Sequence, residues 1–556
     1  MAPSKVWQFF KRTESNNSAK CLICDFELMT NGSTSPLWTH YNAWHKKEKH
    51  TLKSTRKSIV PQKRLKRTYI KKTKKDKPLN RERKEMITQS ICEVITSDLL
   101  PFSFVENNGF KNLMNLIEPN YQIPCRKTIS TRIEQLYENK VNDTKNKLER
   151  INGIALTTDG WSSLAIDSYI TYTGHYFDKN WTLCNVTGIT HDNTSNITNA
   201  VKNLEDQFNL YSSRCAAHTI QLAIKKGLDE NVCSRLLKTA SLIVAAFRQS
   251  PKRSKALQLY LQQTGQKQLT LLQSCPIRWN SSLAMLDRLL TLRTAVVAVI
   301  SDREYFNTKI AKKLEMLEED WDKCEVLVKL LKPLQLATTL LCSEQQITIS
   351  MVRPLIGSLL TKHLCSNQTD CTFATMFKNT VSTDLAKRFS MESVSEKNTN
   401  EIPVNVSQIA SLLDPRYKNL KFEHSEEIKY RIQSIVRSKI LSVNHISTTV
   451  CGNTQIAKKT ILDELMGQFS DDDVDEFTRY LSEPQINHNE NPCLWWKARE
   501  NVYPKISVLA KNILCIPASS ASSERVFSTA GNIITPKRNL MTPYHLSALV
   551  FLKNND

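Results

Sequence analysis

Two cysteines and two histidines near the N-terminus have the spacing of zinc ligands. Cys21 and Cys24 are separated by two residues, and His40 and His45 by four. Thiolates and neutral imidazoles in this pattern fill the four positions of a tetrahedral structural zinc site. His50 is a substitute ligand with poorer spacing, and the alternative is four unrelated residues. The sequence predicts a zinc-stabilised domain whose small core comes from Trp7, Phe9, Phe10, Leu37, Trp38 and Trp44.

A second set of candidate residues consists of carboxylates. Asp159 closes an extended segment from Ile154 to Thr158, and Asp192 closes another from Val186 to Thr190. Both segments are rich in the β-branched residues that favour strands. Two carboxylates at strand ends suggest a divalent-metal site. Asp-Gly and Asp-Asn also start ordinary turns, and that alternative stays open.

Length and composition indicate the class of protein. A chain of 556 residues is too long for one core, so we expect two to four domains. Only 12 residues are glycine, which favours a mostly helical protein. We find neither a signal peptide nor an apolar run long enough to span a bilayer, and we expect a soluble intracellular protein without membrane partners. The 15 cysteines are dispersed, as expected of reduced thiols.

The positive charge is concentrated in one segment. Residues Lys46 to Lys84 contain 18 Lys or Arg and 3 Asp or Glu, which is 15 of the 22 net positive charges. Such a block is typical of a disordered tether, a nuclear import signal or a clamp on nucleic-acid phosphates. We therefore expect a nuclear protein, and candidate DNA contacts are Lys63, Arg64, Lys66 and Arg67.

The N-terminal segment resembles a BED-type zinc finger. It has the family's order of an N-terminal Trp and Phe followed by two Cys and two His, in Trp7, Phe9, Cys21, Cys24, His40 and His45. The resemblance implies a small finger with structural zinc, whose helix carries the histidines and enters the major groove of double-stranded DNA.

Later segments resemble the hAT-superfamily transposases. Six single residues match a segment before that family's catalytic core, and six further motifs follow in family order. The single residues are Asp98, Pro101, Phe110, Pro119, Tyr121 and Pro124. The motifs are Thr157 to Ser163, Thr190 to Asn196, Arg214 to Ile224, Cys275 to Leu290, Ser411 to Leu420 and Ile516 to Pro543.

This resemblance implies a mixed α/β, mostly helical fold, in which a long all-helical insertion interrupts an RNase H-like core. The expected domains are a BED-type finger (1–50), a basic linker (51–84), a helical DNA-binding or dimerisation-type domain (85–152), the first part of the core (153–290), the insertion (291–490) and the rest of the core with the dimerisation region (491–556). Within the insertion, an apolar stripe at helical spacing predicts core packing for Leu314, Leu317, Trp321, Cys324, Leu327, Leu331 and Leu334.

The same resemblance implies a catalytic trio. The family's three carboxylates correspond to Asp159, Asp192 and Glu524, which would hold two magnesium or manganese ions for phosphodiester cleavage. From the residues alone, Glu524 is also explained by a position in the first turn of a helix, where an acid complements the helix dipole.

Two further pairs have competing interpretations. Trp279, beside Arg278, matches a Trp that in the family stacks on a base flipped out near the cleavage site, but a lone Trp is more often part of a core. Cys215 and His218 resemble half of a metal site. Because no second pair is evident, we expect a structural role beside the active site.

The catalytic segment is shorter than the resemblance requires. Trp181 matches the start of the third strand and stands only 11 positions before Asp192. A strand, a helix and a fourth strand do not fit there, since such a crossover needs about a dozen residues or more. We expect a deletion near 184–186, from splicing or decay, that displaces Asp192 from Asp159 and impairs catalysis.

These observations support three hypotheses. The first is a nuclear, zinc-finger DNA-binding protein derived from a hAT transposase, acting as a transcriptional regulator or architectural factor. The second is an active cut-and-paste transposase. The third is a scaffold that self-associates through about Cys493 to Leu552. Phosphate-binding glycine loops and a Gly-x-Ser-x-Gly elbow are absent from the sequence, so small-molecule nucleotide hydrolysis and esterase chemistry are not expected.

Overall fold

The structure is a computed structural model. It divides into two compact units, Met1–Lys77 and Pro78–Asp556, which are described separately. The residues it describes are 5–13, 18–30, 33–45, 79–148, 154–162, 168–176, 188–208, 210–275, 278–391, 404–443, 475–534 and 541–555.

The first unit is a small finger. A 3-10 turn η1 (Lys5–Gln8) precedes an antiparallel sheet of β1 (Phe10–Arg12), β2 (Ser18–Cys21) and β3 (Glu27–Met29), which is followed by helix α1 (Ser35–His40) and a π-helical turn η2 (Tyr41–His45). Pro36 stands in the first turn of α1, where its missing N–H has no intrahelical role. Within the described residues of this unit, the buried core consists of Val6, Phe10, Ala19, Cys21, Leu37 and Tyr41.

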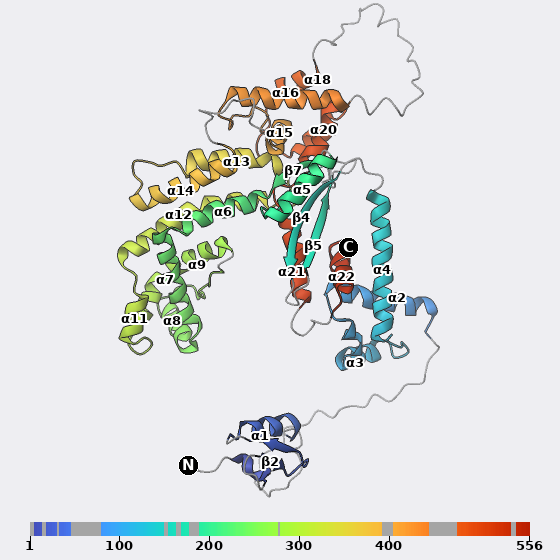
Figure 1. Cartoon of the computed structure of the whole chain (residues 1–556), viewed down its shortest axis with the longest axis vertical. Coiled ribbons are helices and arrows are strands. Elements are labelled where there is room, and N and C mark those ends of the chain that lie inside the picture. The colour runs from blue at the N-terminus through green and yellow to red at the C-terminus, as the bar shows by residue number, and fades with distance from the viewer. Residues whose placement is uncertain are drawn as a thin grey trace, which may run out of the picture. The chain divides into compact units, whose positions relative to one another are not determined.

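The second unit begins with helices that pack against the C-terminus. These are α2 (Arg81–Ser97), the 3-10 turn η4 (Phe102–Glu106), α3 (Asn108–Ile117) and α4 (Arg126–Leu148). Their core is shared with α21 (Ala521–Ile533) and α22 (Pro543–Asn555), as Figure 1 shows for α22 beside α4. The two ends of this unit therefore form one packed region.

A four-stranded mixed sheet stands at the centre of the second unit. Its strands are β4 (Ala155–Ser162), β5 (Ser168–His175), β6 (Gly188–His191) and β7 (Tyr211–Arg214), in the order β5-β4-β6-β7. Strand β5 is antiparallel to β4, whereas β6 and β7 run parallel to it, and α5 (Ser195–Phe208) connects these two strands. The third strand expected from Trp181 lies outside the described residues.

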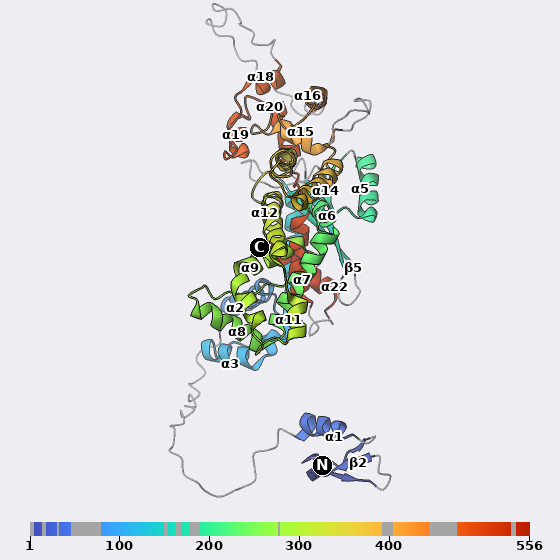
Figure 2. The ribbon, with the colours of Figure 1, turned by 90° about the vertical axis from the view of Figure 1, so that its left-hand side faces the viewer.

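The largest core joins nine helices of the described chain, which lie together in Figure 1 and Figure 2. They are α6 (Ala216–Leu228), α7 (Asn231–Arg248), α8 (Pro251–Gln263), α9 (Trp279–Thr291), α10 (Arg293–Ser301), α11 (Thr308–Leu314), α12 (Glu318–Leu341), α13 (Val352–Ser358) and α14 (Thr372–Arg388). The domain boundary expected at residue 290 divides helices that pack together.

The predicted apolar stripe is buried with one exception. Leu314, Trp321, Leu327 and the other members belong to the largest core. Leu317 is 65% exposed, so its inclusion was wrong. It precedes α12 as the N-cap residue, in extended backbone, and the helical spacing does not extend to it.

A third core holds the later helices of the second unit. These are α15 (Val406–Leu413), α16 (Glu426–Val443), α18 (Glu476–Ser482), α19 (Pro492–Arg499) and α20 (Pro504–Leu514). A fully buried ion pair joins α13, which follows the 3-10 turn η5 (Ile349–Met351), to this region. Arg353 on α13 donates to the two carboxylate oxygens of Glu423 at 2.7 and 2.6 Å. The fold is mixed and mostly helical, and none of the described helices is long and apolar enough to cross a membrane.

Candidate metal centre and carboxylate cluster

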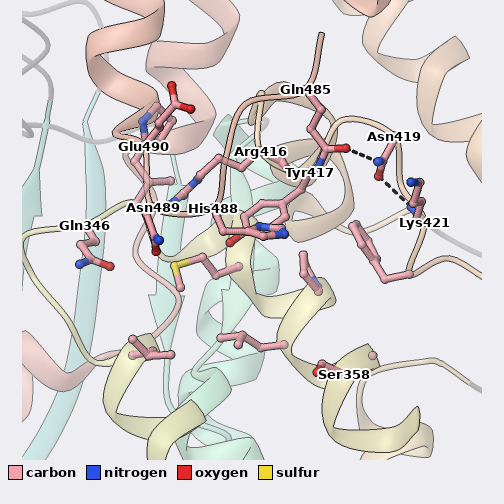
Figure 3. Close-up of a pocket in the computed structure, with 18 of the residues that line it drawn as sticks. Gln346, Ser358, Arg416, Tyr417, Asn419, Lys421, Gln485, His488, Asn489 and Glu490 are labelled. Carbon is pink, nitrogen blue, oxygen red and sulfur yellow. Dashed lines mark hydrogen bonds between the residues drawn. The ribbon is translucent and has the colours of Figure 1, made fainter. Parts of the chain in front are cut away.

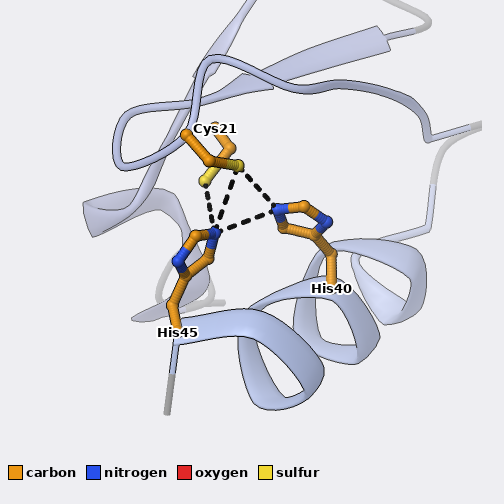
Figure 4. Close-up of side chains that lie close together, drawn as sticks. Cys21, His40 and His45 are labelled. Carbon is orange, nitrogen blue, oxygen red and sulfur yellow. Dashed lines mark hydrogen bonds between the residues drawn. The ribbon is translucent and has the colours of Figure 1, made fainter. Parts of the chain in front are cut away.

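Four ligand atoms converge in the finger. Cys21, Cys24, His40 and His45 each offer one ligand atom, and these atoms all lie within 4.8 Å of one another. Nε2 of His45 lies 3.4 Å from Sγ of Cys21 and 3.2 Å from both Sγ of Cys24 and Nε2 of His40 (Figure 4). Zinc bonds of about 2.3 Å to sulfur and about 2.0 Å to nitrogen place the ligand atoms of a tetrahedron about 3.3–3.8 Å apart. The donor set fits zinc, and the three quoted distances are close to these values.

A tight turn presents the two cysteines. Cys21 ends β2, and its N–H donates to the carbonyl of Phe26 at 2.8 Å, while the N–H of Asp25 donates to the carbonyl of Cys21 at 3.0 Å. Asp25 has a φ of 60°, a left-handed conformation that aspartate tolerates better than most residues. The turn closes with Cys24 between these bonds, facing the histidines.

The π-helical turn brings the two histidines together. In a regular α-helix, residues five apart point about 140° away from each other. The π turn of η2 has i→i+5 bonding, which returns His45 to the side of His40. Their ring centroids are 5.1 Å apart. Burial and the neighbouring His45 lower the pKa of His40, which favours the neutral imidazole that a metal requires.

The three predicted carboxylates lie around one end of the central sheet. Asp159 is on β4 and Asp192 directly follows β6, and the parallel register pairs Thr158 with His191, the residues just before them. The register places the two backbone positions side by side, and the expected displacement of the Asp192 carboxylate stays a prediction. The expectation that Asp159 closes its strand was wrong, because β4 continues to Ser162 through its pairing with β5. Glu524 is in the first turn of α21. Among the described residues, the trio does not meet the 4.8 Å ligand spacing seen in the finger.

The carboxylates influence one another electrostatically. Burial raises the pKa of Asp159, with a further increase from the charge of Asp192. Burial also raises the pKa of Glu524, and Asp159 adds to it. Raised carboxyl pKa values from burial and like charges are frequent at functional sites, although structural clusters produce them as well.

His218 pairs with one member of the trio. Its Nδ1 lies 3.0 Å from Oδ1 of Asp192, and this hydrogen bond lowers the pKa of Asp192 and raises the pKa of His218. The sequence analysis placed His218 beside the active site but missed this partner. The available signal was its position in the first turn of the helix that follows β7, next to the strand that Asp192 ends.

Hydrogen bonds hold α21 against the sheet. Oγ1 of Thr157 lies 2.7 Å from Oγ of Ser523, and the N–H of Ala216 donates to the carbonyl of Ala518 at 2.8 Å. The Cys215 sulfur caps α6 and accepts from the N–H of Ser520 at 3.4 Å. Burial raises the pKa of Cys215 to about 11, so this thiol is neutral and structural.

Arg278 and Trp279 have different environments. Arg278 is exposed, and its charge acts on Glu524, opposing the rise in that carboxyl's pKa. Trp279 is only 6% exposed and belongs to the largest core. This burial favours the core-packing alternative over base stacking in the present conformation. The four basic-linker candidates, Lys63, Arg64, Lys66 and Arg67, lie outside the described residues, as do residues 184–186.

Three family models match parts of the chain. The BED zinc finger matches residues 4–50, the ZBED1 RNase-like helical domain matches residues 213–330, and the hAT family C-terminal dimerisation region matches residues 476–555. The matched regions are thus similar to BED zinc fingers and to hAT-family proteins. The helical match spans the predicted boundary at residue 290, in agreement with the packing of α6 to α12.

The curated relatives of this chain are distant in sequence. Human zinc finger BED domain-containing protein 4 is 24% identical over 99% of this chain and 52% of its own length. A putative AC transposase of Zea mays is 23% identical, over 82% of this chain and 63% of its own length. A putative transcriptional regulator, tpeD, of Talaromyces stipitatus is 24% identical, over 83% and 61%. The chain thus spans between half and two thirds of the length of these relatives.

Proposed function

We propose that this protein binds double-stranded DNA in the nucleus through its zinc-loaded finger and acts as a regulator or architectural factor. The observation that carries the proposal is the ligand set of Cys21, Cys24, His40 and His45, whose atoms lie within 4.8 Å of one another in a segment matched by the BED zinc finger. Zinc bound there would supply the structural link between the β2–β3 turn and the π turn. The names of the relatives, a putative AC transposase and a putative transcriptional regulator, support the class of function.

Cations around the finger would supply the affinity for phosphates. Lys11 and Arg12 are exposed on β1, and Lys20 is exposed on β2. The basic linker, with 15 net positive charges between Lys46 and Lys84, would add a contact that does not depend on base sequence. Base contacts would come from the finger itself, since phosphate contacts position a protein without specifying a sequence.

The first experiment selects bound sequences from a pool of random duplexes with the full-length protein. We expect enrichment of a defined sequence by the wild type and its loss in the double variant Cys21→Ser, His45→Ala. The matched control is Cys365→Ser, because Cys365 is an exposed thiol outside the finger. Binding should weaken steeply between about 50 and about 200 mM salt. Undiminished selection by the double variant would refute the proposal.

We also propose that the protein self-associates through its C-terminal region. The support is the match of residues 476–555 to the hAT dimerisation region. Sedimentation of the full-length protein should give a mass above the 63.7 kDa of one chain, and removal of the region should lower it. A monomeric wild type at micromolar concentration would contradict this part of the proposal.

Metal-dependent DNA strand cleavage is the second candidate function. The observation that favours it is the register that aligns Asp159 and Asp192 on neighbouring parallel strands, with Glu524 electrostatically coupled to both. The strand order and the flanking α21 support an RNase H-like core, with the helical insertion beginning at α6. Asp159, Asp192 and Glu524 would hold magnesium or manganese, which would activate the attacking oxygen and stabilise the leaving oxygen.

Nicking of supercoiled plasmid in the presence of manganese tests this second function. Glu524→Gln should abolish nicking, because the amide removes a ligand charge while keeping the shape of the side chain. Glu315→Gln is the matched control, since Glu315 is an exposed acid just before α12 and outside the trio. Equal nicking by wild type and Glu524→Gln would assign the activity to a contaminant.

A further inference from the structure

A large cavity lies in the second unit and is lined by none of the finger's ligands or the three carboxylates. It has a volume of about 1450 Å³ and is lined by residues of α12 and α13, by residues 416–424 and by residues 485–494. Figure 3 shows the labelled side chains of these segments around one central space. Cavities for small ligands are usually about 300–1,000 Å³, so this one has room for a segment of chain. The lining residues Arg416, Tyr417 and Asn419 belong to a sequence motif, Ser411 to Leu420, that the proposed function does not use.

We propose that this cavity binds a short acidic peptide segment of a partner protein, anchored by apolar side chains. The chemistry of the lining carries this inference, which goes beyond DNA binding and does not rest on it. The apolar part of the lining consists of Leu340, Ile347, Met351, Leu355, Phe422 and Leu494. Leu494 is 64% exposed, and Leu340, Leu355 and Phe422 are half-buried, so apolar surface is available to a ligand.

Amide side chains form the polar rim of the cavity. Gln345, Gln346, Asn419, Gln485 and Asn489 all line it and are exposed. Amides donate and accept hydrogen bonds, as an extended peptide backbone requires. Part of the rim is already fixed by internal bonds: the Asn419 amide donates to Gln485, and Asn419 Oδ1 accepts from the N–H of Lys421 at 3.1 Å. A pre-organised rim reduces the entropy lost on binding.

The charges of the cavity favour an acidic ligand. Lys362 and Lys421 are exposed at the rim, and within the described residues neither has a carboxylate within 4.0 Å. The charge of Arg416 is matched by Asp414 at 2.8 Å. Glu490 is the single carboxylate in the described lining, and its Oε1 accepts from the N–H of Asn487 at 3.1 Å. The described lining therefore has two lysines without a carboxylate partner, Lys362 and Lys421, and one carboxylate, Glu490, and this balance favours an acidic ligand.

The aromatic residues argue against a nucleic-acid ligand. Tyr417 is only 9% exposed; its ring stacks on His488 at 5.5 Å between centroids, and the Arg416 guanidinium lies 5.1 Å from the ring centroid. The Tyr417 ring is therefore not open to a base. Single-stranded nucleic acids are bound by accessible aromatic faces and a cationic track, whereas an apolar floor with amides suits a peptide.

Fluorescence anisotropy with the full-length protein tests the proposal. The probe is a fluorescein-labelled twelve-residue peptide of Asp, Ser and Gly that carries Leu at two positions, and a second peptide has Lys in place of each Asp. We expect the acidic peptide alone to bind. The variant Lys362→Glu, Lys421→Glu should weaken its binding at least about tenfold, and Leu494→Asp should weaken it as well.

The matched control is Lys255→Glu, Lys267→Glu, which changes the charge equally at exposed lysines outside the cavity. It should bind the acidic peptide like the wild type. Absence of binding by the wild type, or equal loss in both double variants, would overturn the proposal. A second probe is a labelled twelve-nucleotide oligothymidine. If it binds the wild type but not the cavity variant, and neither peptide binds, the cavity is a nucleic-acid site and the peptide proposal is wrong. Duplex selection by the cavity variant should be unchanged, which separates this result from the DNA-binding proposal.

Discussion

The finger and the carboxylate cluster both contain metal-binding side chains, thiolates and imidazoles in the first and carboxylates in the second, and the chain assembles them differently. The finger gathers Cys21 and His45 from one short segment, around a core of six buried residues. The cluster takes Asp159 from strand β4 and Glu524 from helix α21 near the C-terminus. The central sheet and the three large cores of the second unit hold these two elements in place. The finger has a small core and four ligands that lie close together, whereas the carboxylates of the cluster are held by extensive packing.

This difference indicates what stabilises each site. In the finger, metal binding supplies the stability that a small core lacks, so the four ligands and the fold depend on each other. In the cluster, strand register and helix packing position the carboxylates whether or not a metal is present. Removal of the metal should therefore unfold the finger and leave the sheet intact. Disruption of packing in the second unit should destabilise the sheet and leave the finger folded.

Removal of zinc should have the largest effect. Zinc binding by fingers corresponds to an apparent free energy of about 10–16 kcal/mol at neutral pH, more than the six-residue core can replace. Cys21→Ser, or a chelator, should abolish the hydrogen-exchange protection of β2 and leave that of β4 unchanged. Exchange measured by mass spectrometry on the full-length protein checks both. A finger that keeps its protection without zinc would contradict this assignment, and Cys365→Ser serves as the control.

Much of the finger could be predicted from sequence because its contacts are local. The four ligands were identified by spacing, and Phe10 and Leu37 occupy the core as expected. The π turn could not be predicted, since the four-residue gap before His45 is also compatible with an extended linker. The ligand set nevertheless required such a turn once His40 was placed at the end of a helix.

The cluster was less predictable because its contacts join distant segments. Asp192 directly follows β6 as expected, whereas Asp159 lies inside β4, and their alignment follows from a parallel register that spacing alone did not predict. The pairing of His218 with Asp192, the burial of Trp279 and the continuity of the helical core across residue 290 all depend on through-space packing. Sequence periodicity describes which face of an element is buried, but not which element covers it.

A packing change beside the cluster should reduce stability less than zinc removal does. Its effect should be confined to the second unit. A Cβ at Gly188 would lie 2.7 Å from Cδ1 of Ile516 and 2.9 Å from the carbonyl of Tyr211, so Gly188→Ala must shift β6 from β7. Overpacking of this kind usually costs about 1–3 kcal/mol. We expect a lower urea midpoint and reduced exchange protection of β6, with zinc content unchanged.

Gly109→Ala is the matched control for this change. Gly109 lies in α3, where an added Cβ meets nothing within 4 Å, and alanine is the better helix former by up to about 1 kcal/mol. It should be neutral or slightly stabilising. If Gly188→Ala were equally well tolerated, the strands would not fix the position of Asp192, and the contrast between the two sites would be lost.

The smallest effect is expected from the ion pair of the cluster, and it should depend on pH. The pKa of Asp192 is lowered from 3.8, so its contribution to stability is present above that value and is lost as pH falls through the folded pKa. The pKa of His218 is raised from 6.5, so its contribution is fully present below 6.5 and is lost as pH rises through the folded pKa. The two contributions overlap between about pH 4 and pH 6.5.

His218→Gln should therefore destabilise the second unit most near pH 5.5 and least near pH 8.5. The loss should be about 1 kcal/mol or less, because both side chains are partly exposed to solvent. Thermal unfolding of variant and wild type at the two pH values measures the difference. A metal bound by Asp192 would compete with His218, so manganese should reduce the pH dependence of the wild type if the carboxylates close around an ion. A pH dependence that manganese leaves unchanged would show that Asp192 keeps its histidine partner and that the carboxylates do not close around the ion.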